Sequence, residues 1–238
     1  MADRYVIFNA DDFGASEGIN RGIIHCHTQG VLTSTSLMVT GHAAEEAASL
    51  SHVHPELSVG LHWDVWGEDE RSFDLGDLGA VRDELERQLD QFSQLMGYPP
   101  THVDSHRHAH RDPRVMSIFA ETLEPLGVPI RGDGKVSFVG GFYGQWEFKK
   151  TELQYVGVSF LTHLLSEETV DGWTEISCHP GFRSREFSSV YDLEREEEIR
   201  TLTDSRVLAA VNDLGIQLRS YRDYARTGGE HDGVTAPS

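Results

Sequence analysis

Short apolar runs alternate with segments of helical spacing from one end of the chain to the other. Repeated alternation of this kind is typical of β-α units built around a mainly parallel sheet, so the fold class that we expect is α/β. The apolar runs predict strands near Tyr5–Asn9, Val31–Val39, Leu57–Leu61, Thr101–Ser105, Val128–Arg131, Thr174–Cys178 and Ile216–Arg219.

The segments between these runs carry helix start and stop signals. Ser16 is a capping residue at the start of one helix and Gly30 ends it, while Asp112 precedes a proline at the first position of another. Further helices are expected over Ala43–Leu50, Asp83–Met96 and Glu194–Leu202. The charged run from Glu194 to Glu198 is interpreted as the solvated face of the last helix and receives no functional role.

Two segments lack a clear periodic pattern. Gly132–Gly144 contains five glycines among scattered aromatic residues and is expected to form a loop over the functional site. Arg226–Ser238 is expected to be a disordered tail. Residues 1–225 are assigned to a single domain, because no linker rich in proline, glycine or serine interrupts them.

Composition narrows the range of partners. The chain has 238 residues and a formal net charge of -19, and 38% of its residues are hydrophobic, which is enough for a packed core. Nucleic acid and anionic membranes are disfavoured as partners, because both require a clustered Lys/Arg surface that this sequence does not show. The acidic surplus is typical of a soluble protein.

The number of cysteines and the N-terminal residues indicate the cellular compartment. Cys26 and Cys178 are too few for a disulfide framework and lie in apolar segments, so we expect buried free thiols. Residues 4–8 form an apolar run without the long hydrophobic region of a signal peptide, and no segment reaches membrane-spanning length. A cytoplasmic protein follows by default, and base rates among enzymes favour a homodimer.

Two adjacent carboxylates, Asp11 and Asp12, follow the first predicted strand directly. Inside a strand their side chains would point to opposite faces, whereas past its end the chain bends and both can reach one cavity. In a β/α barrel the carboxyl ends of the strands form the reactive rim. The alternative is a turn in which an aspartate caps a helix, and for an isolated pair that interpretation would be the better one.

Histidines recur at later predicted strand ends. His62 closes the third strand, and His179 closes the next-to-last strand in the motif Cys-His-Pro-Gly. If buried, a polar strand face needs a metal, a hydrogen-bond network or water. While a strand lasts, a period of two places five polar residues on one face, but a barrel strand is short and the later ones are expected to enter the loop: His102, Asp104, His106, His108 and His110. For His108 and His110, an exposed histidine-rich loop is an equal alternative.

Asp12, His62 and His106 together make a set of two histidines and one carboxylate with open positions. Such a set is typical of a catalytic divalent ion rather than a closed structural site. Asp11 is then an unligated carboxylate beside the ion, and His179 is a candidate proton donor. These are the minimum requirements for metal-assisted hydrolysis.

The residues just described resemble the YdjC-like carbohydrate deacetylase family, which includes chitooligosaccharide deacetylases. The matching motifs lie within residues 9–223 of 238, in order and at plausible spacing, so the match is more specific than any one motif. They are Asn9–Gly14, Val31–Val39, Gly60–His62, His102–His106, Cys178–Gly181 and Ser220–Asp223.

The resemblance implies a distorted β/α barrel of the TIM-like type, related to polysaccharide deacetylase barrels. It implies a divalent metal ion, Mg²⁺ in the first place, with Zn²⁺, Mn²⁺ or Co²⁺ as alternatives. Asp12 would be a metal ligand with His62 and His106, Asp11 the general base, and His179 the matching acid candidate. Arg131 aligns with a basic position that holds substrate or orients Asp11.

The function that follows is removal of an N-acetyl group from a small acetylated sugar, such as an N-acetylglucosamine oligosaccharide, giving acetate and an amino sugar. His108 is a candidate substrate contact, and Trp63, Trp66 or Tyr143 would either stack on a sugar face or simply pack. The alternatives are a metal-dependent glycosidase or phosphoesterase, and a non-catalytic protein that binds sugar or metal. Asp11 favours catalysis, because pure binding does not need it.

Overall fold

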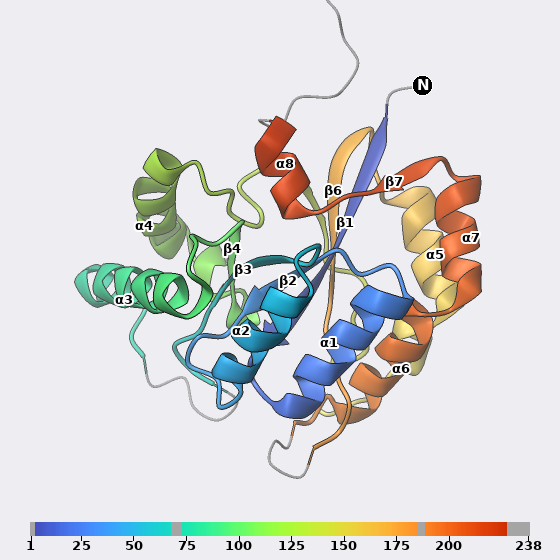
Figure 1. Cartoon of the computed structure of the whole chain (residues 1–238), viewed down its shortest axis with the longest axis horizontal. Helices are drawn as coiled ribbons and strands as arrows, with labels where there is room; N and C mark the ends of the chain where they lie inside the picture. The colour runs from blue at the N-terminus through green and yellow to red at the C-terminus, as the bar shows by residue number, and fades with distance from the viewer. Residues whose placement is uncertain (1–2, 68–72, 185–188, 228–238) are drawn as a thin grey trace, which may run out of the picture.

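A parallel sheet is built around the first apolar run of the chain. The computed structural model describes residues 3–67, 73–184 and 189–227, and places seven strands in one sheet (Figure 1). The strands are β1 (Arg4–Phe13), β2 (Ser34–Leu37), β3 (Ser58–Trp63), β4 (Val103–Ser105), β5 (Ser137–Val139), β6 (Gly172–Cys178) and β7 (Ile216–Leu218).

The order of the strands is β4-β3-β2-β1-β6-β5, and every pairing is parallel. The strand β7 pairs with the first residues of β1, and β2 pairs with the last residues of β1. The two strands thus share β1 as a neighbour, one at its start and one at its end. All strands therefore present their carboxyl ends at one end of the sheet. The predicted α/β class with a parallel sheet is confirmed.

Helices connect the strands, and their ends follow the predicted signals. The Ser16 side chain accepts from the Ile19 amide at the start of α1, Asp112 accepts from the Arg114 amide at α4, and Gly97 ends α3 with φ 75°. The bounds are α1 (Glu17–Gln29), α2 (Ala44–Val53), α3 (Leu78–Met96), α4 (Pro113–Leu123), α5 (Val158–Glu167), α6 (Asp192–Leu202), α7 (Ser205–Asp213) and α8 (Tyr221–Thr227), with the short 3₁₀ helices η1 (His106–Arg111), η2 (Glu124–Leu126) and η3 (Leu153–Val156).

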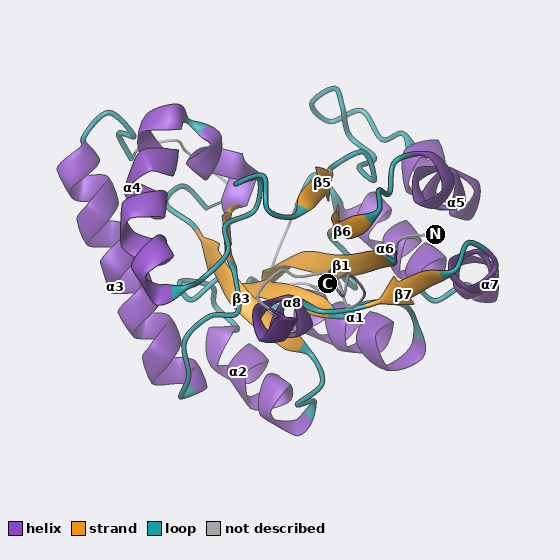
Figure 2. Cartoon of the chain, turned by 90° about the horizontal axis from the view of Figure 1, so that it is seen from above, coloured by secondary structure: helices purple, strands orange, loops and turns teal. Residues whose placement is uncertain are grey.

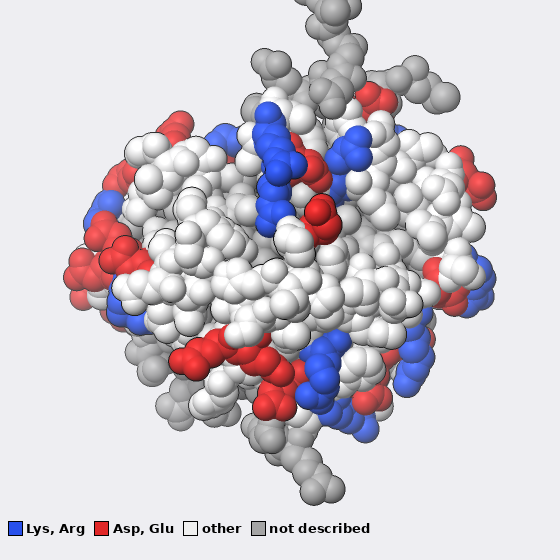
Figure 3. Space-filling model, viewed as in Figure 1, with Lys and Arg blue, Asp and Glu red and all other residues white. Residues whose placement is uncertain are grey.

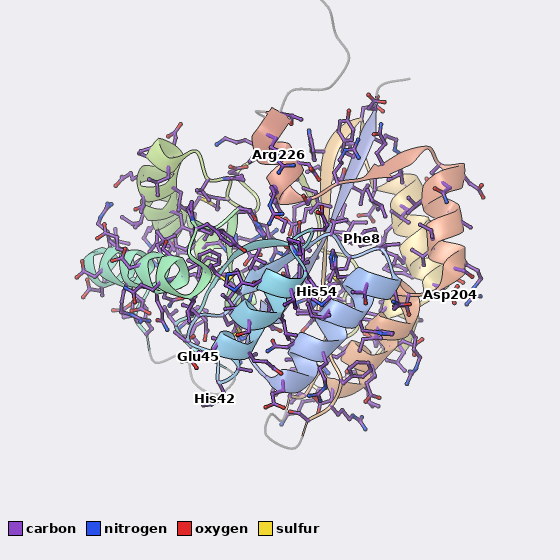
Figure 4. The ribbon with its side chains drawn as sticks, in the orientation of Figure 1. Phe8, His42, Glu45, His54, Asp204 and Arg226 are labelled. Atoms are coloured by element: carbon purple, nitrogen blue, oxygen red, sulfur yellow. The ribbon has the colours of Figure 1, made fainter. Side chains whose placement is uncertain are left out.

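The sheet is curled, and helices α1 to α7 lie around its outside, while α8 lies across the end at which the strands begin (Figure 2). Phe8 of β1 belongs to the main core between sheet and helices, and Figure 4 marks it in the interior, in contrast to Asp204 at the periphery near α7. Tyr5 and Ile7 point to the other face, where they pack with Trp173 and Tyr221. Along the inward face of β1 the side chains thus change from apolar at its start to polar at its end.

The structure corrects several predicted elements. Helices α5 and α7 were absent from the prediction, and Gly132–Gly144 is not wholly a loop, because it contains β5. The strand predicted at Val128–Arg131 is reduced to a single bridge between Ile130 and Val103. The predicted tail begins too early, since Arg226 and Thr227 belong to α8. Residues 228–238 lie outside the described residues.

The described surface carries charges of both signs. On the face shown in Figure 3, acidic and basic side chains form small groups separated by uncharged surface. Cys26 and Cys178 are buried free thiols, as predicted. None of the helices in the described part of the chain combines the length and apolar character that crossing a bilayer demands.

Candidate active site

Three side chains from three strand ends converge at the carboxyl end of the sheet. Asp12 lies near the end of β1, His62 near the end of β3, and His106 directly after β4. The Asp12 Oδ1 atom is 3.3 Å from His62 Nε2 and 3.3 Å from His106 Nδ1. One ligand atom from each residue falls within 4.8 Å of the others, so the set is compact enough to hold one ion. The predicted convergence of these three residues is therefore observed.

The aspartate pair reaches the site through an irregularity inside β1, not beyond its end as we expected. The register between β1 and β2 shifts between Ala10 and Phe13, and Asp12 has φ 68°. A positive φ is uncommon for a residue other than glycine, and a bulge of this kind re-aims a side chain. Asp11 and Asp12 are both buried, and both contribute to one polar cluster despite being neighbours in sequence.

A second carboxylate fixes the orientation of His62. Asp104 Oδ1 lies 2.6 Å from His62 Nδ1, a distance at which that nitrogen donates to the carboxylate. His62 Nε2 then carries a lone pair that faces Asp12 Oδ1, and this buried nitrogen makes no hydrogen bond. Two acceptors facing each other at 3.3 Å need a cation between them, either a proton or a metal ion. The donor set therefore fits a divalent ion.

The carboxylates around His62 also favour a positive charge at this position, as its pKa shows. Burial lowers the pKa, but the Asp104 and Asp12 carboxylates more than reverse this and raise the pKa well above its usual value. For Asp12, burial raises the pKa, yet the Arg195 guanidinium and the two histidines bring it well below its usual value. Asp12 is therefore ionised at neutral pH.

The histidine-rich segment departs from the predicted strand. β4 ends at Ser105, and Arg107 and His108 both have φ 52°, so the period of two stops before His106. His102 is fully buried and stacks on Tyr221 at 3.9 Å, away from the set of three. The later histidines thus leave the strand, as its expected short length implied, and only Asp104 of the five lies within β4.

The last two histidines of that segment differ from each other. His110 is fully buried and bonds to the Ser105 hydroxyl at 2.6 Å and the Arg131 carbonyl at 3.1 Å, so it is neither a ligand nor an exposed loop residue. His108 is half-buried, with its ring 5.6 Å from that of Phe138. Its predicted contact with substrate stays a prediction.

Asp11 is held by a buried arginine. Arg131 Nη1 and Nη2 donate to the two Asp11 carboxylate oxygens at 2.7 and 2.6 Å, a bidentate geometry. The same guanidinium donates to Glu175 at 2.6 Å and lies 2.8 Å from Asp104. Two roles were predicted for Arg131, contact with substrate or orientation of Asp11. Because Arg131 is fully buried and surrounded by these carboxylates, the predicted substrate contact is wrong, and the geometry fits orientation of Asp11.

This pairing keeps Asp11 charged. Burial raises the pKa of Asp11, but the Arg131 guanidinium and its hydrogen bonds bring the pKa below its usual value. Asn9 also donates to Asp11 Oδ1 at 3.0 Å. The carboxylate is therefore ionised and fixed in place beside the set of three. Because Asp11 also forms a compact group with His62 and Asp104, its role as an unligated base stays a prediction.

His179 faces Asp11 from the end of β6. Its Nε2 lies 3.8 Å from Asp11 Oδ2, and its side chain is 22% exposed. Burial lowers the pKa of His179 to about 4, so the ring is neutral at neutral pH. Its backbone amide donates to Glu198, which also accepts from the Tyr191 hydroxyl at 2.8 Å. The histidine is thus positioned by α6 as well as by its own strand.

The charged run in α6 is not a solvated face, and this corrects the sequence interpretation. Glu194, Arg195 and Glu198 are all buried. Arg195 Nη2 lies 2.6 Å from Asp12 Oδ2, and its Nη1 donates to the His179 carbonyl at 3.2 Å. Burial raises the pKa of Glu198 to about 8. Arg195 lies four residues before the buried Ile199, but the local sequence of the helix does not distinguish this face from a solvated one.

The predicted sugar-stacking role of Trp63 is also wrong. Its side chain is fully buried, and its ring packs against Phe119 at 5.3 Å and Phe73 at 6.1 Å. The alternative of simple packing is the one observed. Tyr143, in contrast, is partly exposed and lies 5.7 Å from the His179 ring.

Comparison with known proteins finds a consistent group of relatives. Residues 5–213 match the family model described as YdjC-like protein. A carbohydrate deacetylase from Geobacillus stearothermophilus is 34% identical, with 93% of this chain and 98% of that protein covered. A chitooligosaccharide deacetylase from Klebsiella pneumoniae subsp. pneumoniae is 32% identical, with coverage of 93% and 99%.

Solved structures share the fold. A crystal structure from Enterococcus faecalis, of a protein given provisionally as a cellobiose-phosphate cleavage protein, has a TM-score of 0.77 at 24% identity, with 93% of this chain and 99% of that chain covered. A family 4 carbohydrate esterase from Streptomyces lividans, in complex with acetate, has a TM-score of 0.56 at 11% identity, with coverage of 91% and 92%. The distorted β/α barrel predicted for the chain is confirmed by this likeness, in the form of a curled parallel sheet surrounded by helices.

Proposed function

The chain belongs to the YdjC-like protein family, and from this premise we propose that it is a metal-dependent carbohydrate deacetylase. The reaction is hydrolysis of the N-acetyl amide of a small acetylated sugar, and its products are acetate and an amino sugar. The relatives named carbohydrate deacetylase and chitooligosaccharide deacetylase support this assignment over nearly the whole chain.

One observation carries the proposal. Asp12, His62 and His106 converge on a single point, and the ionised carboxylate of Asp11 lies beside them without a place in the set. A protein that merely bound a metal or a sugar would gain nothing from a second buried carboxylate fixed by its own arginine. A hydrolase needs such a group to accept a proton from water.

The ligands in this proposal are one carboxylate oxygen and two imidazole nitrogens. When bound, a divalent ion polarises the amide carbonyl and lowers the pKa of a water molecule. The family resemblance points to Mg²⁺, whereas two imidazole ligands suit Zn²⁺ better than Mg²⁺ on grounds of ligand type. The identity of the ion is therefore the first question for experiment.

The remaining chemistry belongs to side chains of this protein. Asp11 takes a proton from the attacking water, and Arg131 keeps its carboxylate aligned during the transfer. The carbon–nitrogen bond breaks after the water oxygen has added to the carbonyl carbon, and the departing nitrogen needs one proton. His179 Nε2, 3.8 Å from Asp11 Oδ2, is placed to receive the proton from Asp11 and deliver it to that nitrogen.

Acetate release tests the proposal. Short N-acetylglucosamine oligomers are incubated with the metal-free protein and with added Mg²⁺, Mn²⁺, Co²⁺ or Zn²⁺, and acetate, shortened sugars and phosphate are measured. We expect acetate with at least one ion and none with chelator present. A shortened sugar without acetate would identify a glycosidase, and sugar binding without any product would identify a binding protein. A cytoplasmic location and a homodimer stay predictions.

A further inference from the structure

Aromatic rings lead from His179 to the protein surface. The ring of Tyr143 lies 5.7 Å from that of His179 and stacks on Tyr191 at 4.8 Å with an interplanar angle of 8°. On the outer side, Trp146 meets Tyr143 edge-on at 5.8 Å and 84°. Trp146 is 58% exposed, so much of its ring faces solvent two ring contacts away from the candidate acid.

The segment that carries Trp146 is fixed to the body of the protein. The Gly144 amide donates to the Tyr191 hydroxyl at 2.8 Å, and the Glu152 amide donates to the Gly144 carbonyl at 2.8 Å. Gln145 is buried and donates to the Val190 carbonyl at 2.7 Å and to Glu194 at 3.0 Å. Gly144 and Gln145, the two residues before Trp146, are therefore held by hydrogen bonds to α6 and to the residues just before α6.

An exposed tryptophan on an anchored loop is not explained by packing. What distinguishes Trp146 from the other exposed apolar side chain of this loop, Phe148, is its ring contact with Tyr143, which connects it to His179 and continues an aromatic surface from the site outward. The faces of pyranose rings present C–H groups, and aromatic rings bind them through the same apolar and electrostatic attractions that they offer to other partners. Stacking of this kind needs no charge, which matches a neutral N-acetylated sugar.

We propose that Trp146, supported by Tyr143, is a stacking platform for a second sugar ring, next to the one whose N-acetyl group is removed. In this arrangement Trp146 contributes to binding only when the substrate has a second ring. This inference rests on the proposed deacetylase function, because it takes the position of the reacting ring from Asp11 and His179.

Kinetics on substrates of increasing length test the platform. Trp146→Ala is expected to lower kcat/KM for the disaccharide and longer oligomers roughly 3- to 10-fold, as loss of one aromatic contact would, and to leave kcat/KM for the monosaccharide unchanged. Trp146→Phe keeps a ring and is expected to retain most of the activity. Phe148→Ala is the matched control, because Phe148 is 80% exposed on the same loop and its ring contacts Lys149.

A binding measurement without turnover gives an independent readout. Chelator-treated protein is titrated with the disaccharide and its tryptophan fluorescence is recorded. Of the four tryptophans, Trp63 and Trp173 are buried and Trp66 is half-buried, so Trp146 is the most exposed and stacking on it is expected to change the emission. We expect Trp146→Phe to abolish the change and Phe148→Ala to preserve it. An emission change that survives in Trp146→Phe would overturn the platform.

The outcomes separate the two proposals. If wild-type protein releases no acetate from any oligomer with any ion, the deacetylase function fails, and the fluorescence titration still decides whether Trp146 binds sugar. If acetate is released but Trp146→Ala lowers kcat/KM equally for mono- and disaccharide, the function stands and the platform is refuted. If Trp146→Ala instead changes the sedimentation of the protein and not its length preference, Trp146 is a contact between copies of the chain and the platform is again refuted.

Discussion

Replacement of Arg131 by methionine tests the electrostatic balance inside the barrel. The guanidinium lies within 2.8 Å of oxygens from Asp11, Asp104 and Glu175, and it is fully buried. Methionine has a similar volume and no charge. The variant therefore keeps the packing and leaves three buried carboxyl groups without their shared cation.

The expected loss of stability is large and depends on pH. Removing one partner of a buried ion pair costs about 3–5 kcal/mol in the free energy of unfolding, and Arg131 serves more than one partner. In the wild type the pKa values of Asp11 and Asp104 are lowered, since the attraction of Arg131 outweighs burial, so their stabilisation is complete above the unfolded pKa and lost as pH falls. In the variant, burial is no longer opposed by Arg131, the largest of the groups that lower the two pKa values, so both values rise and stability is lost as pH rises. The difference between the two proteins should be greatest near neutral pH and shrink towards about pH 4.

Denaturant unfolding at about pH 7.5 and about pH 4.5 measures this difference. Arg131→Lys keeps the charge without the bidentate geometry and is expected to fall between wild type and Arg131→Met. The control is Arg114→Met, because the 2.8 Å pair of Arg114 with Asp112 lies on the surface and is expected to make no measurable difference. A loss in Arg131→Met below about 1 kcal/mol, or one that is equal at both pH values, would refute the reasoning.

Three further predictions concern individual side chains of the site and the core. Asp11→Asn should bind metal as the wild type does but release acetate about 100-fold more slowly or worse, whereas His106→Ala should lose both metal binding and acetate release. Metal analysis and the acetate assay measure the two properties. Full activity in Asp11→Asn would remove the base assignment. Arg195→Met should weaken metal binding by about 10- to 100-fold, because Arg195 fixes one oxygen of a ligand at 2.6 Å, and a metal titration with unchanged affinity would contradict this. Trp63→Ala should cost about 3–5 kcal/mol in the free energy of unfolding, measured with denaturant, because its buried ring leaves a cavity; a stable variant with lowered sugar binding would restore the stacking role.

The site residues at strand ends could be predicted because parallel strands bring their carboxyl ends to one place. Asp12, His62 and His106 are 50 and 44 residues apart in sequence, yet each follows an apolar run, and that pattern alone places them at the same end of the sheet. The bulge that directs Asp12 inward could not be predicted, because the φ angle of 68° at this residue depends on its neighbours in the folded structure, which the local sequence does not reveal.

The contribution of α6 was missed for a different reason. Charged residues usually face water, and Glu194–Glu198 contains four acidic residues and an arginine, so the local pattern favours a solvated helix. Arg195 and Glu198 are buried because their partners lie outside the helix: Asp12 comes from β1, at the other end of the sequence, and the His179 amide follows β6. A buried charge of this kind is recognisable only once its counter-charge has been placed.

Two arginines divide the adjacent aspartates between two tasks. Arg131 binds both oxygens of Asp11 and keeps that carboxylate ionised, whereas Arg195 binds Oδ2 of Asp12 and leaves Oδ1 to face His62 and His106. Neighbouring carboxylates in one cavity would otherwise compete for the same cation, because like charges at short range cannot both stay ionised without compensation. Separate cations, one from the edge of the sheet and one from α6, allow one aspartate to act as a base while the other acts as a ligand. The adjacency of Asp11 and Asp12 is therefore useful for catalysis only because distant parts of the chain supply both guanidinium groups.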